Sequence, residues 1–373
     1  MDNDAHEGPG SQPDEADVNT LVGGADRIPE SVTDVISAEE AAGDAAPPSG
    51  SGVIARLFRE NAEPRRVELD EASSLATADA NFVWVDLDGY NPDDLTAVAQ
   101  HLDLPDEAVE LALEGWRRPR LGVFGDRFFA TVTVPHVDLV AHRVVAGELD
   151  VFVGRNYLVS AHKRPLPFAD RVLARAVQNP SLLMLDSAFL LSILIDELLA
   201  YYEELTEQLE DEAEAMEVRA LTESSDAVLE DLLQLKRVIF ALYRLASQHR
   251  ATLEAFLRPD FPLVGGDAIE PYFRDLDERM GRLLDALTAT KESVNGAFDI
   301  YVSQVSHRTN DIMKVLTIAS VTLLPTSVIL GFWGTSFEEP RINTTVGFIA
   351  MVALIVLTTA GSLLLFARRG WLR

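Results

Sequence analysis

The sequence predicts a mixed α/β domain, followed by long stalk helices and two transmembrane helices at the C-terminal end. Strand-like runs alternate with short helical stretches before residue 166, and apolar residues then recur with a helical period up to residue 308. Two long uncharged runs complete the chain. With 373 residues, the chain has room for more than one domain.

The first segment, residues 1–52, is acidic and poor in apolar side chains. Through Gly50 it holds 12 acidic residues against one basic residue, Arg27, a net charge of −11. Such a composition cannot bury enough apolar surface to offset the entropy of ordering, so we expect a disordered, solubilising segment. A brush that weakly attracts cations is the alternative. The segment lacks the basic and apolar regions of a signal peptide.

Residues 53–165 have the pattern of a cytoplasmic α/β domain. Two helices, Asp93–Leu102 and Asp106–Glu114, are expected between the first and second strands, each with an aspartate able to cap its first turn. Gly154 and Arg155 form the expected hairpin turn between the last two strands. The predicted strands are Phe82–Leu87, Arg127–Val134, Glu148–Val153 and Asn156–Ala161.

Residues 166–308 are expected to form a helical domain that ends in a stalk helix. Apolar side chains follow a period near 3.6 over Ser181–Val218, whose second half is densely acidic, and again over Ala227–Leu257. The acidic stretch 203–217 is most simply a solvated face. From Pro271 onward no strong break precedes the membrane, so the spacing predicts one helix of about 60 residues, on the order of 90 Å long.

Two uncharged runs at the C-terminal end are each long enough to cross a bilayer as a helix. Val315–Trp333 has 19 residues and Val346–Ala367 has 22. We therefore expect a first span over 309–333, an external loop over 334–345, and a second span over 346–367.

The basic residues predict the orientation of this hairpin. Lys314 precedes the first span, and Arg368, Arg369 and Arg373 lie in the tail 368–373, whereas the loop has a single arginine. Excess Lys and Arg near span ends marks the cytoplasmic side. We expect a multi-pass protein of the cytoplasmic membrane with both termini inside.

Polar residues recur on one face of the first span. Steps of three and four residues place seven positions on one helix face, and four of them are polar. Polar groups at membrane depth usually face a water-filled path or another helix. Close helix packing without a pore is the alternative, because small and hydroxylated residues also serve that purpose. The seven are Asn310, Met313, Thr317, Ser320, Leu324, Ser327 and Gly331.

The composition excludes several classes of protein. The formal net charge of −29 is unsuited to nucleic acid and favours cations. Without cysteine there are no disulfides or thiolate sites. Phosphate-binding glycine loops, nucleophile elbows and HExxH motifs are absent from the sequence, so we expect neither an enzyme nor an enzymatic cofactor. The seven histidines lack ligand spacing and are expected to be surface or helix residues; His307, near the membrane entrance, is the candidate for pH or transition-metal effects.

Several short motifs occur together with the C-terminal hairpin. They are WRRPR at 116–120, GRNYLVS at 154–160, LKR at 235–237, PYFRD at 271–275, TNDIMKVLT at 309–317, Pro325, and the pair Trp371 and Leu372. In this order and spacing they resemble the CorA-type divalent-cation transporter superfamily, which includes the ZntB zinc transporters. The resemblance covers about residues 80–373.

The resemblance implies a funnel-shaped homopentamer in the lipid bilayer, with the first span lining the pore and the second forming an outer ring. It places Asn310 and Met313 at the cytoplasmic end of the pore. Leu316 and Leu324 would form hydrophobic constrictions, and Ser327 a polar ring. The implied partners are lipid, further copies of the chain and divalent cations.

The pore mouth departs from the family pattern. The signature Gly-Met-Asn is replaced by Gly334, Thr335 and Ser336. Serine hydroxyls still accept hydrogen bonds from the water around Mg²⁺, but they are shorter than an amide, so the ring would be wider and less selective. Glu338 and Glu339 would add carboxylates that concentrate cations, unless they are only solvated loop charges.

A regulatory cation site is expected in part. In magnesium members, carboxylates of neighbouring subunits bind cation and hold the funnel closed, and Asp275 matches one side. The usual partner aspartate is replaced by Leu111, with Glu110 adjacent. The alternative for Asp275 is a routine role near a helix start.

Three functions remain open from the sequence. The first is transport of Mg²⁺, with Co²⁺ or Ni²⁺ as further ions. The second is a ZntB-like Zn²⁺ pathway, which could be coupled to protons. The third is a non-conducting membrane scaffold or partner subunit, which the altered signature motivates.

Overall fold

The computed structural model describes residues 52–60, 62–115, 119–185, 187–257, 269–335 and 344–371. The chain divides into two compact units. The first contains residues up to 207 together with 237–288, and the second contains 208–236 and everything from 289 onward. The expected disordered segment 1–52 lies outside the described residues except for Gly52.

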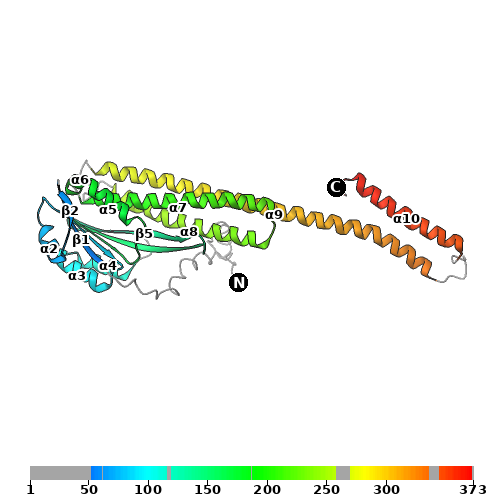
Figure 1. Cartoon of the computed structure of the whole chain (residues 1–373), viewed down its shortest axis with the longest axis horizontal. Helices are drawn as coiled ribbons and strands as arrows, with labels where there is room; N and C mark the ends of the chain where they lie inside the picture. The colour runs from blue at the N-terminus through cyan, green and yellow to red at the C-terminus, as the bar shows by residue number, and fades with distance from the viewer. Residues whose placement is uncertain are drawn as a thin grey trace, which may run out of the picture. The chain divides into compact units, whose positions relative to one another are not determined.

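A seven-stranded sheet forms the centre of the first unit (Figure 1). The strand order is β2-β1-β3-β7-β6-β5-β4, in which β3 and β7 pair in parallel and the other neighbours are antiparallel. The strands are β1 (Gly52–Arg59), β2 (Ala62–Val67), β3 (Phe82–Asp88), β4 (Arg120–Phe124), β5 (Arg127–Asp138), β6 (Arg143–Val153) and β7 (Tyr157–His162).

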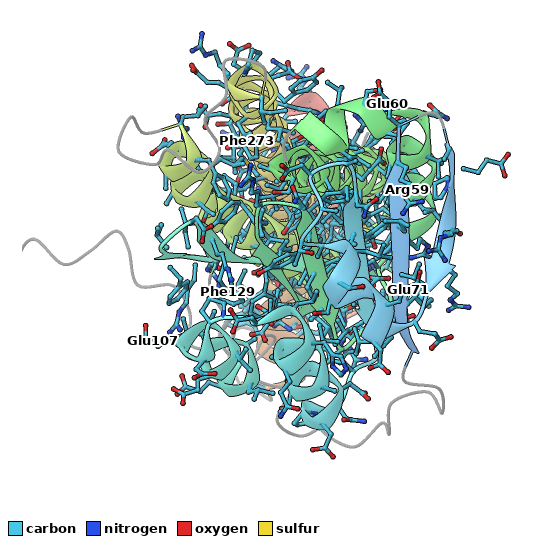
Figure 2. All side chains as sticks on the ribbon, turned by 90° about the vertical axis from the view of Figure 1, so that its left-hand side faces the viewer. Arg59, Glu60, Glu71, Glu107, Phe129 and Phe273 are labelled. Carbon is cyan, nitrogen blue, oxygen red and sulfur yellow. The ribbon has the colours of Figure 1, made fainter. Side chains whose placement is uncertain are left out.

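Both faces of the sheet are covered by helices (Figure 1). Helices α2 (Leu69–Leu75), α3 (Pro92–Leu102) and α4 (Asp106–Glu114) bury one face in a core that includes Leu57, Val85 and Phe129. Figure 2 shows Phe129 in the interior and Glu107 projecting outward from α4.

The other face meets a second set of helices, of which α7 and α8 are the long ones. Thr133 of β5 donates its backbone N–H to Nε2 of His249 (2.9 Å), and its carbonyl accepts from Tyr202 Oη (3.3 Å). These helices are α5 (Ala169–Gln178), α6 (Pro180–Leu185), α7 (Ala188–Thr222) and α8 (Asp226–Phe256). Such buried polar pairs fix which residues of sheet and helix meet.

Two helices complete the chain: α9 (Glu270–Gly334, 65 residues) and α10 (Thr345–Arg368, 24 residues). The prediction of one unbroken helix from the stalk into the first span is confirmed. The four predicted strands, the two helices before β4 and the helix near 227–257 are also present, but β6 begins five residues earlier than predicted and β5 ends four residues later.

Several sequence expectations were wrong. Strands β1, β2 and β4 were missed, because β1 and β2 are rich in arginine, β2 contains Pro64, and β4 contains Gly122; pairing with neighbours supplies what local propensity lacks. The run Ser181–Val218 is divided between α6 and α7, and Ser187 before α7 donates its hydroxyl to the carbonyl of Gly154.

The expected helix caps and one histidine also differ. Asn91, not Asp93, caps α3 by accepting from the N–H of Asp94, and α4 starts after Pro105 without a side-chain cap. His162 is neither a surface nor a helix residue. It is buried in β7, where its Nε2 lies 3.3 Å from Oδ1 of Asp86.

Candidate ion-conducting helices

The apolar ends of α9 and α10 are the membrane candidates of the second unit. Each contains an 18-residue window of high mean hydropathy, 2.0 in α9 and 2.4 in α10, and neither window is buried within the chain. Thr344 caps α10 by accepting from the N–H of Gly347 (3.1 Å). Pro325 lies inside α9 without ending it, although proline removes one backbone donor from the helix.

The face predicted to line a pore is exposed along α9. Of the eight predicted positions, which are the seven named above together with Leu316, seven are exposed and Thr317 is half-buried. The hydroxyl of Thr317 donates to the carbonyl of Met313 (2.7 Å), and that of Ser327 donates to Leu323 (2.9 Å). The oxygen of a hydroxyl that donates can still accept, so these groups retain the capacity to bind water.

A second row on α9 is less exposed and lies on another side of the helix. The spacing of three and four residues again places its members on one face. Among them is Trp333, whose Nε1 donates to the carbonyl of Gly347 in α10 (3.1 Å). The row consists of Ile318, Thr322, Pro325, Thr326, Ile329 and Trp333. The hairpin therefore leaves the predicted pore face free of contact with its own second helix at the Trp333 end.

Only part of the predicted mouth falls within the described residues. Gly334 ends α9, and Thr335 donates its hydroxyl to the carbonyl of Phe332 (2.6 Å). Ser336, Glu338 and Glu339 lie outside the described residues.

The two candidate carboxylates of the first unit are both exposed. Asp275 lies near the start of α9 and Glu110 lies on α4. Leu111, at the position of the usual aspartate, packs against the core of the sheet, so it has a structural role here. Within the described part of the chain, no group of three or more His, Asp or Glu residues could hold a metal ion.

Sequence reasoning missed an ion-pair cluster at the base of α9, within the first unit. Arg279 of α9 lies 2.5 Å from Oδ1 of Asp196 and 2.5 Å from Oε2 of Glu203, both on α7. The hydrogen bonds that Arg279 donates to the carboxylate of Glu203 are the main cause of a raised pKa for Arg279. Arg171 and Arg175 of α5 pair with the same stretch of α7. Part of the acidic run of α7 is therefore not a plain solvated face, and it ties α9 to α7.

Two of the motifs, GRNYLVS and PYFRD, contribute to packing within the first unit. In GRNYLVS, a Cβ on Gly154 would lie 2.4 Å from a ring carbon of Tyr157, so only glycine fits beside that ring. Ser160 of the same motif accepts from Trp84 Nε1 (2.9 Å) and donates to Asp86 (2.6 Å). In PYFRD, Phe273 is fully buried, and its ring centroid is 5.1 Å from that of Phe256 (Figure 2).

The sequence profile of the CorA-like Mg²⁺ transporter protein family matches residues 79–369. The chain belongs to this family. The cobalt/magnesium transport protein CorA of Thermotoga maritima is 25% identical over 340 residues, covering 87% of this chain and 97% of that protein. This assignment confirms the resemblance seen in the sequence. It also confirms the expectation that the protein is a transporter and not an enzyme.

Solved structures confirm the fold class. The complete CorA magnesium transporter of Methanocaldococcus jannaschii superposes with a TM-score of 0.72 at 21% identity, covering 86% of this chain and 99% of that one. The full-length CmaX protein gives a TM-score of 0.65 at 20% identity, with the same coverage of each chain. The shared fold extends through the sheet, the long helices and the C-terminal hairpin.

Proposed function

We propose that this protein carries divalent cations across the cytoplasmic membrane, Mg²⁺ first and Co²⁺ or Ni²⁺ next. The observation that carries the proposal is the exposed, partly polar face of α9 within an otherwise apolar span of a CorA-family chain. A face that one chain leaves open can be covered by further copies around a central path, which fits a homopentamer.

The proposed pore has a defined order along α9. Residues 309–333 form the pore helix, residues 346–367 the outer helix, and both termini lie in the cytoplasm. Asn310 and Met313 form the inner end, Leu316 and Leu324 the apolar constrictions, and Thr317, Ser320 and Ser327 polar rings between and above them. Gly331 lets the helices approach closely.

The proposed mouth explains how the ion preference can differ from that of family members with Gly-Met-Asn. Gly334 ends the helix, and the hydroxyls of Thr335 and Ser336 accept hydrogen bonds from hydrated cations. Glu338 and Glu339 raise the local cation concentration. Mg²⁺ gives up its water reluctantly, so a hydroxyl ring suits a hydrated ion but holds it less firmly than amide carbonyls do. A ZntB-like Zn²⁺ pathway coupled to protons is the second candidate, because the altered mouth weakens selectivity for Mg²⁺.

We propose that cytoplasmic cations regulate transport by binding to Asp275 and Glu110. Both carboxylates are exposed in the single chain and are thereby open to a neighbouring subunit. With Leu111 committed to the sheet core, Glu110 is the acidic side chain left to face Asp275.

Ion flux into liposomes tests the proposal directly. Purified protein is reconstituted and offered Mg²⁺, Co²⁺, Ni²⁺ and Zn²⁺ in parallel, with and without a pH gradient. We expect saturable Mg²⁺ uptake that is independent of the gradient, and Ser336→Asn should raise the preference for Mg²⁺ over Co²⁺. Thr344→Asn is the matched control, since it makes the same hydroxyl-to-amide change at the cap of α10, where asparagine caps equally well.

Three results would change the conclusion. Zn²⁺ uptake driven by the proton gradient would replace the first candidate with the second. An equal effect of Ser336→Asn and Thr344→Asn would remove Ser336 from the mouth. Absence of flux for every ion from an assembled oligomer would leave a non-conducting scaffold or partner subunit.

A further inference from the structure

Four arginines lie on the β1–β2 pair, at one edge of the sheet of an otherwise acidic protein. Arg59 donates from Nε to Oδ1 of Asn81 (2.8 Å), and Figure 2 shows it on the edge strands. Arg65 pairs with Glu71 of α2 (2.5 Å). The other two, Arg56 and Arg66, are direct cross-strand partners. Neither forms an ion pair with any carboxylate in the described part of the chain.

This arrangement of Arg56 and Arg66 is costly for the isolated chain. Like charges directly opposite each other on an antiparallel pair are destabilising. Arg56 is half-buried, and its guanidinium lies 5.3 Å from the ring centroid of Trp84. Burial lowers the pKa of Arg56, and the nearby carboxylate of Asp86 opposes that shift. An anion held between the two guanidinium groups would offset this repulsion.

The two arginines line a hollow of about 450 Å³. Successive residues of a strand point to opposite faces, so Arg66 lies on the hollow's side of the sheet and Arg65 on the side of α2. Leu173 and Val177 of α5, with Ile54 of β1, form an apolar wall. The volume is within the range of sites for small molecules, which combine apolar walls with a few charged groups.

We propose that this hollow binds a small phosphorylated molecule of the nucleotide class. The planar guanidinium fork matches the oxygens of a phosphate and can bind two of them at once. A phosphate with two negative charges satisfies both arginines, and the apolar wall receives the uncharged part of the molecule. The site is separate from the ion path and does not depend on the proposed transport function.

Glu63 allows a test of whether the hollow prefers a negatively charged ligand. It lines the same hollow, it is exposed, and no ion pair of its carboxylate occurs among the described residues. Its negative charge opposes an anionic ligand, so its neutralisation should strengthen binding where loss of Arg66 weakens it.

Isothermal titration calorimetry on the full-length protein in detergent tests the site with adenosine monophosphate at low ionic strength. We expect one molecule bound per chain, about tenfold weaker binding for Arg66→Gln, and tighter binding for Glu63→Gln. Arg65→Gln is the matched control, because it removes the same charge from the adjacent residue on the other face, and it should leave affinity unchanged. Leu173→Glu, which adds a carboxylate from α5, should abolish binding.

Adenosine and inorganic phosphate, tested as further ligands, separate the contribution of the phosphate group from that of the apolar part of the nucleotide. Adenosine should not bind, and inorganic phosphate should bind more weakly than the nucleotide because it makes no use of the apolar wall. Equal affinity of phosphate and nucleotide would overturn the assignment to nucleotides. No binding to the wild-type chain, or equal losses in Arg65→Gln and Arg66→Gln, would overturn the site itself. Circular dichroism of each variant confirms that the fold is intact, and Arg66→Lys, which keeps the charge without the fork, should lie between wild type and Arg66→Gln.

Discussion

Apolar side chains are buried in the first unit, here called the sheet unit, but exposed in the hairpin that α9 and α10 form. Leu87 and Val159 of the sheet are fully buried, whereas Leu324 and Leu357 of the hairpin are 66% and 72% exposed. Burial of apolar surface stabilises the sheet unit within a single chain. The hairpin has no comparable cover of its own, so lipid or further copies must supply it.

Polar groups show the same contrast. In the sheet unit they pair across long stretches of chain, as Arg279 does with Glu203, 76 residues away. In the hairpin several hydroxyls donate to the carbonyl four residues earlier in the same helix, as Thr317 does to Met313. The hairpin therefore satisfies its polar groups locally, as a helix in hydrocarbon must, and Trp333 supplies a bond between its two helices.

The largest expected effect comes from making one substitution in both regions. Leu87→Ala should reduce the free energy of unfolding by about 2–5 kcal/mol, because it leaves a cavity in the sheet core. Leu357→Ala should cost less than about 0.5 kcal/mol, since its surroundings are lipid or detergent. Thermal unfolding of the purified full-length variants provides the measurement. Equal losses would show that the hairpin is packed as tightly as the sheet.

A buried carboxyl group should make the sheet unit sensitive to pH. Asp150 of β6 accepts from the hydroxyl of Thr131 (2.6 Å), and burial raises its pKa from 3.8 to about 7. Between these values the folded state holds a proton that the unfolded chain releases, so this group's contribution to stability falls as pH rises from about 4 to 7.

Asp150→Asn tests this effect, because asparagine keeps the acceptor oxygen and removes the charge. The variant should be more stable than wild type by roughly 4 kcal/mol at pH 8 and nearly equal to it at pH 4. Unfolding midpoints across that range measure the difference. A gain that is the same at both pH values would mean that Asp150 is not the titrating group.

The smallest expected effect concerns the ion pairs at the base of α9. Arg279→Ala should cost about 1–2 kcal/mol, because Asp196 and Glu203 lose a partner in a partly buried setting. Arg274→Ala is the control on the same helix: its pair with Glu270 is exposed, so its loss should cost less than about 0.5 kcal/mol. Identical costs would show that the Arg279 cluster is only a surface pair.

The sequence by itself determined the features that repeat along the chain. Uncharged runs of sufficient length predicted both membrane helices, and the absence of a break from Pro271 predicted that α9 is continuous. Strand-like runs of apolar and β-branched residues located β3, β5, β7 and the second half of β6. These signals are local, since each depends on the spacing of side chains within one element.

Only the tertiary structure decided the features that need a distant partner. Strand β2 has a polar sequence and forms because β1 pairs with it, and only the structure shows that Leu111, at the position of the expected aspartate, packs against the sheet core. The pairing of Arg279 with Asp196, and of His162 with Asp86, joins residues about 80 positions apart. The spacing of side chains within one segment does not predict such pairs. The two partners interact only after folding has closed the long stretch of chain between them.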